Sequence, residues 1–362
     1  MITGRVAYLC AFDIAHDVPR PWPTRLLGCD LKPWKIESGK RVPRTLSFDR
    51  PLSAVLPNAS RRLANGEMIQ IDRVVRLLPI GALSVVVLVP FRVEQLSDLV
   101  VWHDLSLDGR PVYDEITALA TEALSELRPH LIRPVERLED GEAYTVFCVD
   151  SASMGGFDGP PWLETNRRMV ASLLTQEENE EALSSAEVDE STTRWVSYYR
   201  RDLTVVDWDA ALLVDEAPAL DDALLVLEVA NVELTELECY DRMLDRAVAH
   251  CYPDIGGSWT RSRGEVVREL GEISVDLARM QDELENASKF HGDFHLARIH
   301  RLATERFHLH DWQHTVESKL RTVDGIYQHL KSDLNARWML VLEIAIVLLF
   351  IIDVILIFAG PR

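Results

Sequence analysis

The sequence lacks the short motifs that identify most enzymes and nucleotide-binding proteins. It contains no G-x-x-x-x-G-K-[ST] phosphate loop, no G-x-G-x-x-G turn, no H-E-x-x-H zinc motif and no G-x-S-x-G nucleophile elbow. The glycines of SMGGFDGPPW therefore predict a connector between elements. Serines and carboxylates are present, but their spacing selects no catalytic arrangement. The sequence thus favours a non-enzymatic protein, with an enzyme of unrecognised type as an alternative.

Positive charge and cysteine are also scarce. There are 38 lysines and arginines against 58 acidic residues, for a net charge of -20. This balance argues against direct nucleic-acid binding, because a duplex-binding surface needs a positive patch that displaces counterions. The five cysteines are odd in number and form no C-x-x-C pair, which favours a reducing compartment. The first 20 residues contain no long apolar stretch and so predict neither a signal nor a transit peptide.

The fold class predicted from the hydrophobic pattern is α+β, with a mixed α/β domain over residues 1–215. Strands are predicted at 6–14, 71–78, 83–89 and 143–149, and a helix at 116–127. The aromatic, alternating stretch from Trp195 to Asp215 predicts a β-hairpin with its turn near Arg201 and Asp202. This domain is expected to bind a protein partner of unknown identity.

Residues 216–337 are predicted to be helical. Apolar residues recur there at alternating spacings of three and four, which is typical of a coiled coil or helical hairpin. The hairpin could also mediate homo-oligomerisation. The two apolar seams consist of Val266, Leu270, Ile273, Leu277, Met280 and Leu284, and of Leu320, Val323, Tyr327, Leu330 and Leu334.

A hydrophobic run near the C-terminus predicts one transmembrane helix at 338–358. Its length corresponds to about 31 Å of helix, close to the thickness of a hydrocarbon core. More basic residues precede the run than follow it, so the positive-inside rule predicts a single-pass, tail-anchored protein with a cytoplasmic N-terminal domain. Trp338 is expected at the membrane interface, and Glu343 and Asp353 interrupt the run. These acids are expected either to be tolerated near the interfaces or to associate helices within the membrane.

Histidines cluster between residues 291 and 314. His291 and His295 are spaced i,i+4, as are His310 and His314, so each pair lies on one helical face. Asp293, Asp311 and Glu317 offer further ligands. The pattern supports two alternatives to plain surface polarity: a zinc site, or a cluster that titrates near neutral pH.

The C-terminal third resembles the required-for-meiotic-nuclear-division family. The shared features are the heptad helix, the K-L-x-x-x-x-x-x-Y-x-x-L stretch from Lys319 to Leu330, and a hydrophobic tail with an embedded Leu342–Glu343. The AYTVFCVD strand and the AFDI opening fit the family's N-terminal part. The resemblance implies a membrane-associated protein without a known activity, whose eukaryotic relatives support organellar translation at the mitochondrial inner membrane. The missing transit peptide and the preference for arginine favour a bacterial inner membrane for this chain.

Taken together, these features predict a non-enzymatic, tail-anchored membrane scaffold or tether that presents a partner-binding domain and has no cofactor. The alternative is a metal- or pH-responsive regulatory protein that uses the histidines between His291 and His314, with zinc as the metal.

Overall fold

The structure is a computed structural model that describes residues 1–33, 51–78, 80–139, 141–251, 268, 271, 275 and 294–359. Contacts divide the chain into two compact units. Unit 1 contains residues 1–239 and 280–313, and unit 2 contains residues 240–279 and 314–362. The domain boundaries predicted at 215 and 337 stay predictions.

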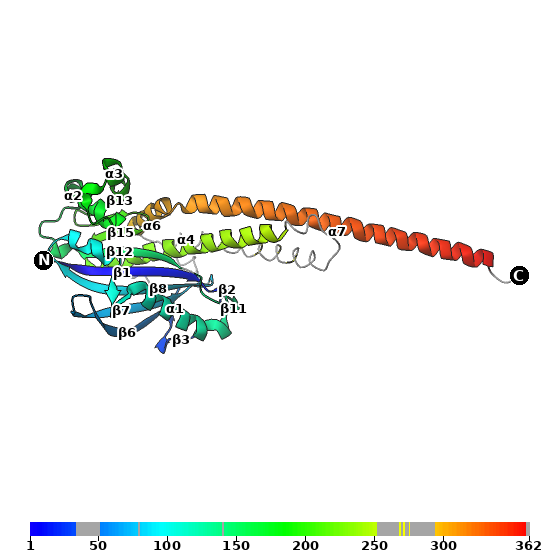
Figure 1. The fold of residues 1–362 in the computed structure, drawn as a ribbon, viewed down its shortest axis with the longest axis horizontal. Helices are drawn as coiled ribbons and strands as arrows, with labels where there is room; N and C mark the ends of the chain where they lie inside the picture. The colour runs from blue at the N-terminus through cyan, green and yellow to red at the C-terminus, as the bar shows by residue number, and fades with distance from the viewer. Residues whose placement is uncertain are drawn as a thin grey trace. The chain divides into compact units, whose positions relative to one another are not determined.

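Unit 1 is built on a large mixed sheet. In the described part of the chain this sheet has nine strands in the order β13-β14-β15-β12-β1-β8-β7-β6-β5. Figure 1 shows β6, β7, β8, β1, β12 and β15 following one another across the sheet. The strands are β1 (Ile2–Asp13), β5 (Lys32–Pro33), β6 (Leu52–Arg62), β7 (Met68–Leu77), β8 (Ala82–Val93), β12 (Glu142–Asp150), β13 (Trp195–Val196), β14 (Leu203–Val206) and β15 (Ala210–Asp215).

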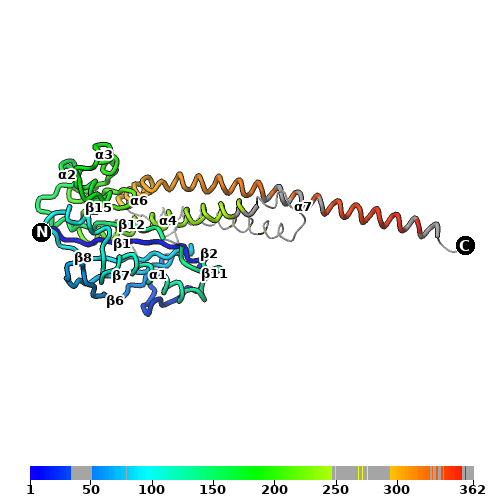
Figure 2. The backbone as a smooth tube through the Cα atoms, viewed as in Figure 1, coloured from blue at the N-terminus to red at the C-terminus, as the bar shows by residue number. Residues whose placement is uncertain are grey.

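In the part of the chain that the structure describes, three two-stranded ribbons accompany the sheet. In Figure 2, the β2–β11 ribbon lies at the C-terminal end of β1. The ribbons pair β2 (Ala15–Asp17) with β11 (Ile132–Pro134), β3 (Arg25–Leu26) with β4 (Cys29–Asp30), and β9 (Ser106–Leu107) with β10 (Arg110–Pro111).

The described residues also form six helices and four short turns. They are α1 (Val112–Leu127), α2 (Gly159–Thr175), α3 (Ser185–Thr193), α4 (Ala217–Cys251), α6 (Phe294–Arg306) and α7 (Leu309–Ala359), with short 3-10 turns η1 (Leu96–Trp102), η2 (Arg128–His130), η3 (Ser151–Ser153) and η4 (Glu180–Ala182).

The sequence pattern identified the central elements correctly. The strands predicted at 6–14, 71–78, 83–89 and 143–149 are confirmed as β1, β7, β8 and β12, and the helix predicted at 116–127 is α1. The hairpin prediction is confirmed only in part, because the region from Trp195 to Asp215 forms three strands. A first turn between 197 and 202 joins β13 to β14, and a second turn at 207–209, which the pattern missed, joins β14 to β15.

One face of the sheet carries the main hydrophobic core. Side chains alternate along β1, so Tyr8, Cys10 and Phe12 point to this face, where α1, η1 and α2 cover them. The Tyr8 ring meets the Tyr113 ring of α1 edge-on at 5.9 Å. His103, after η1, forms a 2.7 Å hydrogen bond with the carbonyl of Leu173 in α2, which ties these elements together.

The opposite face is covered by the first half of α4, and polar contacts fix this helix. Arg5 of β1 pairs with Asp221, and Arg76 of β7 pairs with Glu228. The Asn231 side chain donates a 2.9 Å hydrogen bond to the Glu142 carbonyl at the start of β12. Unit 1 is therefore a three-layer arrangement with the sheet in the middle.

Within unit 2, the end of α4 contacts the start of α7. The Lys319 ammonium lies 2.7 Å from carboxylate oxygens of both Asp241 and Asp245. Leu244, Val316 and Val323 are buried. Among the predicted seam residues, Val323 is buried and Leu320 is half-buried, whereas Val266, Leu270, Ile273, Leu277, Met280 and Leu284 and the side chains of Tyr327, Leu330 and Leu334 lie outside the described part.

The predicted transmembrane helix at 338–358 is contradicted, and with it the single-pass, tail-anchored architecture. No helix in the described part of the chain is both long enough and apolar enough to cross a membrane. Trp338 and Glu343 are exposed in α7, and the Asp353 side chain lies outside the described part.

The buried thiol of Cys148 gives a test of the sheet. Burial raises the pKa of Cys148 to about 12 from an ordinary 9.0, although Arg5 partly opposes the shift. We expect iodoacetamide at pH 8.5 to modify Cys148 about 100-fold more slowly in the native protein than in urea, because only the thiolate reacts. Peptide mass spectrometry measures this, with half-buried Cys29 as the internal control. Equal rates in both conditions would contradict the buried position.

The raised pKa of Cys148 also makes the stability of the protein depend on pH. Between pH 9 and pH 12 the unfolded chain releases the Cys148 proton that the native chain retains. This thiol therefore lowers the free energy of unfolding as the pH rises through that window.

Candidate metal centre

Two aspartates face each other where the β14–β15 pair ends. The register pairs Leu203 of β14 with Val214 of β15, so Asp202 and Asp215 occupy the next opposing positions. Leu203 and Val214 belong to the core on the α1 face, so alternation directs both aspartates to the other face. Like charges placed directly opposite each other in a sheet are destabilising, so this arrangement needs a compensating group.

Asp202 is held in place by its own loop. Its carboxylate accepts hydrogen bonds from the backbone N–H groups of Tyr198 at 2.7 Å and Tyr199 at 3.0 Å. The loop also contacts the start of α2, where the Gly159 N–H donates a 2.8 Å bond to the Arg200 carbonyl. Asp202 is only 3% exposed. The carboxylate is thus oriented before any ligand arrives.

His295 completes the group from α6, 80 residues further along the chain. Its Nε2 lies 4.0 Å from Oδ2 of Asp202, and its ring is 5.7 Å from the ring of Tyr198. One donor atom from each of Asp202, Asp215 and His295 lies within 4.8 Å of the other two. The protein therefore brings two carboxylates and one imidazole together at one end of the sheet.

The electrostatics of the group favour a bound cation. Burial raises the pKa of the Asp215 carboxyl to about 6, a hydrogen bond from the Glu216 N–H opposes this, and the charges of Asp202 and Glu216 add to the rise. Among the described residues, neither Asp202 nor Asp215 forms an ion pair with a lysine or arginine. A buried carboxylate pair is costly unless a proton or a cation compensates it.

The donor set fits a borderline divalent metal. Zinc binds imidazole nitrogen and carboxylate oxygen at about 2.0 to 2.2 Å, which places the ligand atoms of a tetrahedral site about 3.4 Å apart. A side-chain movement of about 1 Å would close the present group around one ion. Three protein ligands would leave a coordination position for water, whereas calcium prefers six to eight oxygen ligands.

The other end of α6 is fixed by an ion pair. The guanidinium of Arg306 pairs with Asp207 in the β14–β15 turn, through a 2.8 Å Nε bond and a second bond from Nη2, and its Nη1 lies 2.5 Å from Glu190 of α3. From His295 to Arg306 the helix rises about 17 Å, as does the extended chain from Asp202 to Asp207. Helix α6 therefore runs alongside β14, and Arg298 in its first half also donates a 3.5 Å hydrogen bond to the Ser197 carbonyl.

Of the four histidines predicted as metal ligands, the described part of the structure places only His295 in this group. His295 joins it, and its partners Asp202 and Asp215 were not among the predicted ligands. His310 and His314 lie exposed on α7, and neither joins a set of three donors in the described part. His291 and Asp293 lie outside the described residues. The sequence signal that was missed is a pair of aspartates, Asp202 at the predicted turn and Asp215 at the end of the predicted hairpin.

One protein family matches the chain over more than half of its length. A family model described as "Uncharacterized protein MJ0711, N-terminal domain" matches residues 3–220. A similar curated protein is uncharacterized protein MJ0711 of Methanocaldococcus jannaschii, which is 24% identical over 224 residues, or 59% of this chain and 65% of the relative. The chain thus spans slightly less than two thirds of that relative's length. No solved structure matches.

These matches correct two predictions. The resemblance to the required-for-meiotic-nuclear-division family is wrong, because the matching family is a different one and nothing points to the former. That resemblance rested on a heptad and a hydrophobic tail, which are compositional features that unrelated helices share. The predicted location in a bacterial inner membrane is contradicted as well, since the matching relative is archaeal and no described helix can span a membrane.

Proposed function

Because the chain belongs to the family of the MJ0711 N-terminal domain, whose description names no activity, we propose from the site alone that it is a metal-responsive regulatory protein. A divalent ion of the zinc class would bind Asp202, Asp215 and His295. The observation that supports this most strongly is the approach of an imidazole to two opposed carboxylates that have no lysine or arginine partner among the described residues.

The response would be the attachment of α6 to the sheet. Without metal, the carboxylates of Asp202 and Asp215 repel each other near the N-terminal end of α6. The C-terminal end of α6 is held by the ion pair between Arg306 and Asp207. With metal, both ends of α6 are held. Residue Phe307 is 1% exposed and continues the chain from α6 toward α7, so the metal would act where the chain leaves the sheet domain. The predicted partner-binding scaffold role remains a proposal compatible with such a switch.

Metal binding is tested on the purified full chain after chelation and dialysis. We expect one Zn²⁺ per chain by elemental analysis, and stabilisation of about 2.7 kcal/mol when free Zn²⁺ is 100 times its dissociation constant. His295→Gln should abolish both effects, because it removes the only nitrogen ligand of the group. His310→Gln is the matched control, since this exposed imidazole lies outside the group. Zinc binding that His295→Gln leaves intact would refute the site.

A second variant separates a metal site from a structural contact. Asp215→Asn should stabilise the metal-free protein at pH 7.5 by on the order of 1 kcal/mol, after allowance for solvent screening, because it removes one of two opposed charges. It should also eliminate the stabilisation by Zn²⁺. Hydrogen exchange of α6 should slow on zinc addition in the wild type and remain unchanged in this variant. Destabilisation of the metal-free variant would indicate a purely structural aspartate.

A further inference from the structure

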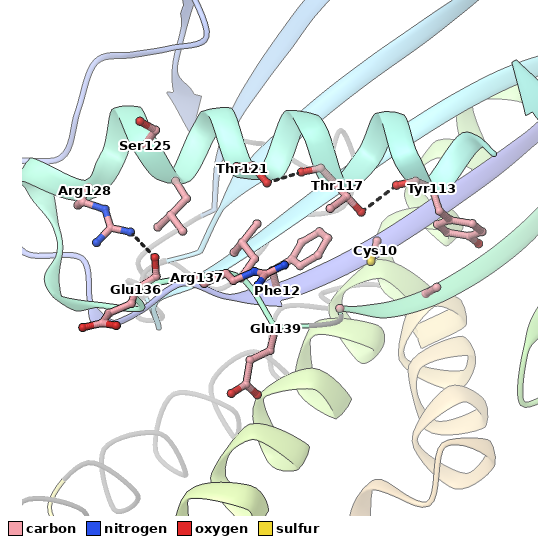
Figure 3. Close-up of a pocket in the computed structure, with 14 residues that line it drawn as sticks. Cys10, Phe12, Tyr113, Thr117, Thr121, Ser125, Arg128, Glu136, Arg137 and Glu139 are labelled. Carbon is pink, nitrogen blue, oxygen red and sulfur yellow. Dashed lines mark hydrogen bonds between the residues drawn. The ribbon is translucent and has the colours of Figure 1, made fainter. Parts of the chain in front are cut away.

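A concave site lies on the face of the sheet that α1 covers, between α1 and the segment that leads into β12. It encloses a cavity of about 600 Å³, within the size range of small-molecule sites. Figure 3 shows α1 along one side and Phe12 of β1 in the floor. Phe12 and Leu124 are buried and give the cavity an apolar base.

The side formed by α1 presents hydrogen-bond acceptors. Thr117, Thr121 and Ser125 recur every four residues and so line one face of the helix. The Thr117 hydroxyl donates to the Tyr113 carbonyl at 2.9 Å, and the Thr121 hydroxyl donates to the Thr117 carbonyl at 2.7 Å. Each of these two hydroxyls already donates its proton to a backbone carbonyl, but its oxygen can still accept a hydrogen bond from a ligand. A ligand along this side would therefore be a hydrogen-bond donor.

The opposite side carries two arginines, Arg128 and Arg137, together with Glu136 and Glu139. Arg128 holds the segment in place, because it donates 2.9 Å bonds to the carbonyls of Val135 and Glu136. Figure 3 shows the Arg137 side chain beside Phe12, whereas the Glu139 carboxylate points away from α1. Arg137 forms no hydrogen bond or ion pair with any residue in the described ranges. Its guanidinium is thus available to a ligand, with the geometry that suits a carboxylate or phosphate.

We propose that this cavity binds a small organic anion. Its carboxylate or phosphate would pair with Arg137, its apolar body would lie against Phe12 and Leu124, and its hydroxyl or amino groups would donate to Thr117 and Thr121. The site is separate from the metal centre, which lies on the other face of the sheet, and neither proposal depends on the other.

Two pairs of probes test the proposal by titration calorimetry on the full chain. One pair is 4-hydroxyphenylacetate and its neutral counterpart 4-hydroxyphenylethanol, and the other is AMP and adenosine. We expect at least one anion to bind, and to bind at least tenfold more tightly than its neutral counterpart. The anion that binds distinguishes a carboxylate ligand from a phosphate ligand.

Two cavity variants and one control variant assign the binding to the cavity. Arg137→Gln should weaken the bound anion at least tenfold, while Arg110→Gln, which alters an exposed arginine that does not line the cavity, should leave it unchanged. Thr121→Val preserves the side-chain shape and should weaken 4-hydroxyphenylacetate relative to phenylacetate. Arg137→Gln should not shift the unfolding midpoint, because Arg137 has no partner in the described part of the chain.

Three results would overturn the proposal. The first is that neither anion binds at millimolar concentration, and the second is that the neutral counterparts bind equally well. The third is that Arg137→Gln, with its unfolding midpoint unchanged, binds the anion as the wild type does.

Discussion

Arg306→Ala is expected to lower the free energy of unfolding of the sheet domain by about 3 to 5 kcal/mol, because it leaves a buried carboxylate without its partner. The side chains of Arg306 and Asp207 are 11% and 6% exposed. Asp207 also accepts a 2.7 Å hydrogen bond from the Trp208 N–H, and its carbonyl accepts a 2.9 Å bond from the Tyr144 hydroxyl. The substitution therefore affects the β14–β15 turn as well as α6.

Urea unfolding followed by tryptophan fluorescence measures this effect, with Trp208 next to the affected aspartate. Arg301→Ala is the matched control, since Arg301 is an exposed arginine in the same helix and the substitution should change stability by less than about 0.5 kcal/mol. A double variant, Arg306→Ala with Asp207→Asn, should recover part of the loss because the unpaired charge is gone. If Arg306→Ala were as mild as the control, the ion pair would not anchor α6.

Gly81→Ala is expected to destabilise the same domain by about 4 kcal/mol or more, through two additive causes. Gly81 has a φ of +97°, which side chains rarely adopt. A Cβ there would also lie well under 3.0 Å from the backbone oxygen of Ala15. The Gly81 carbonyl accepts bonds from the N–H groups of Ile14 at 2.9 Å and Ala15 at 3.2 Å, so relieving the clash would break the junction of β1 and β2.

Gly66→Ala separates the two causes. Gly66 also has a positive φ, +87°, but a Cβ there would meet nothing within 4 Å. This control should therefore cost only the backbone strain, about 1 to 2 kcal/mol. The difference between the two variants in urea unfolding measures the close approach of Gly81 to Ala15. Equal losses would mean that the β7–β8 turn moves away from β2 without penalty.

The alternating and periodic segments of unit 1 were predictable because their local pattern matches their environment. The SVVVLV stretch of β8 has the β-branched composition of a strand covered on both faces, and α1 buries Ile116, Ala120 and Leu124 at helical spacing. The second turn of the Trp195–Asp215 region was missed because β14 is only four residues long. A strand that short shows too few alternations to be separated from its neighbours.

The candidate site was only half predictable. The clustered histidines predicted His295 as a ligand, and the i,i+4 spacing suggested His291 as its partner. Among the described residues, the structure places His295 beside Asp202 and Asp215, which come from the Trp195–Asp215 region. Sequence spacing detects ligands on one helix, whereas ligands gathered from a hairpin and a distant helix depend on packing.

The sequence by itself determined the acidic composition, the position of the central strands, α1 and the long C-terminal helices, because these depend on residue type and on a period of two or 3.6. Only the tertiary structure decided which face of the sheet α6 covers, that Asp202 and Asp215 oppose each other, and that Arg137 lies in a cavity beside Phe12. These features arise from strand register and from contacts between residues far apart in the chain. A local pattern contains no information about such pairings, because many registers would satisfy it equally well.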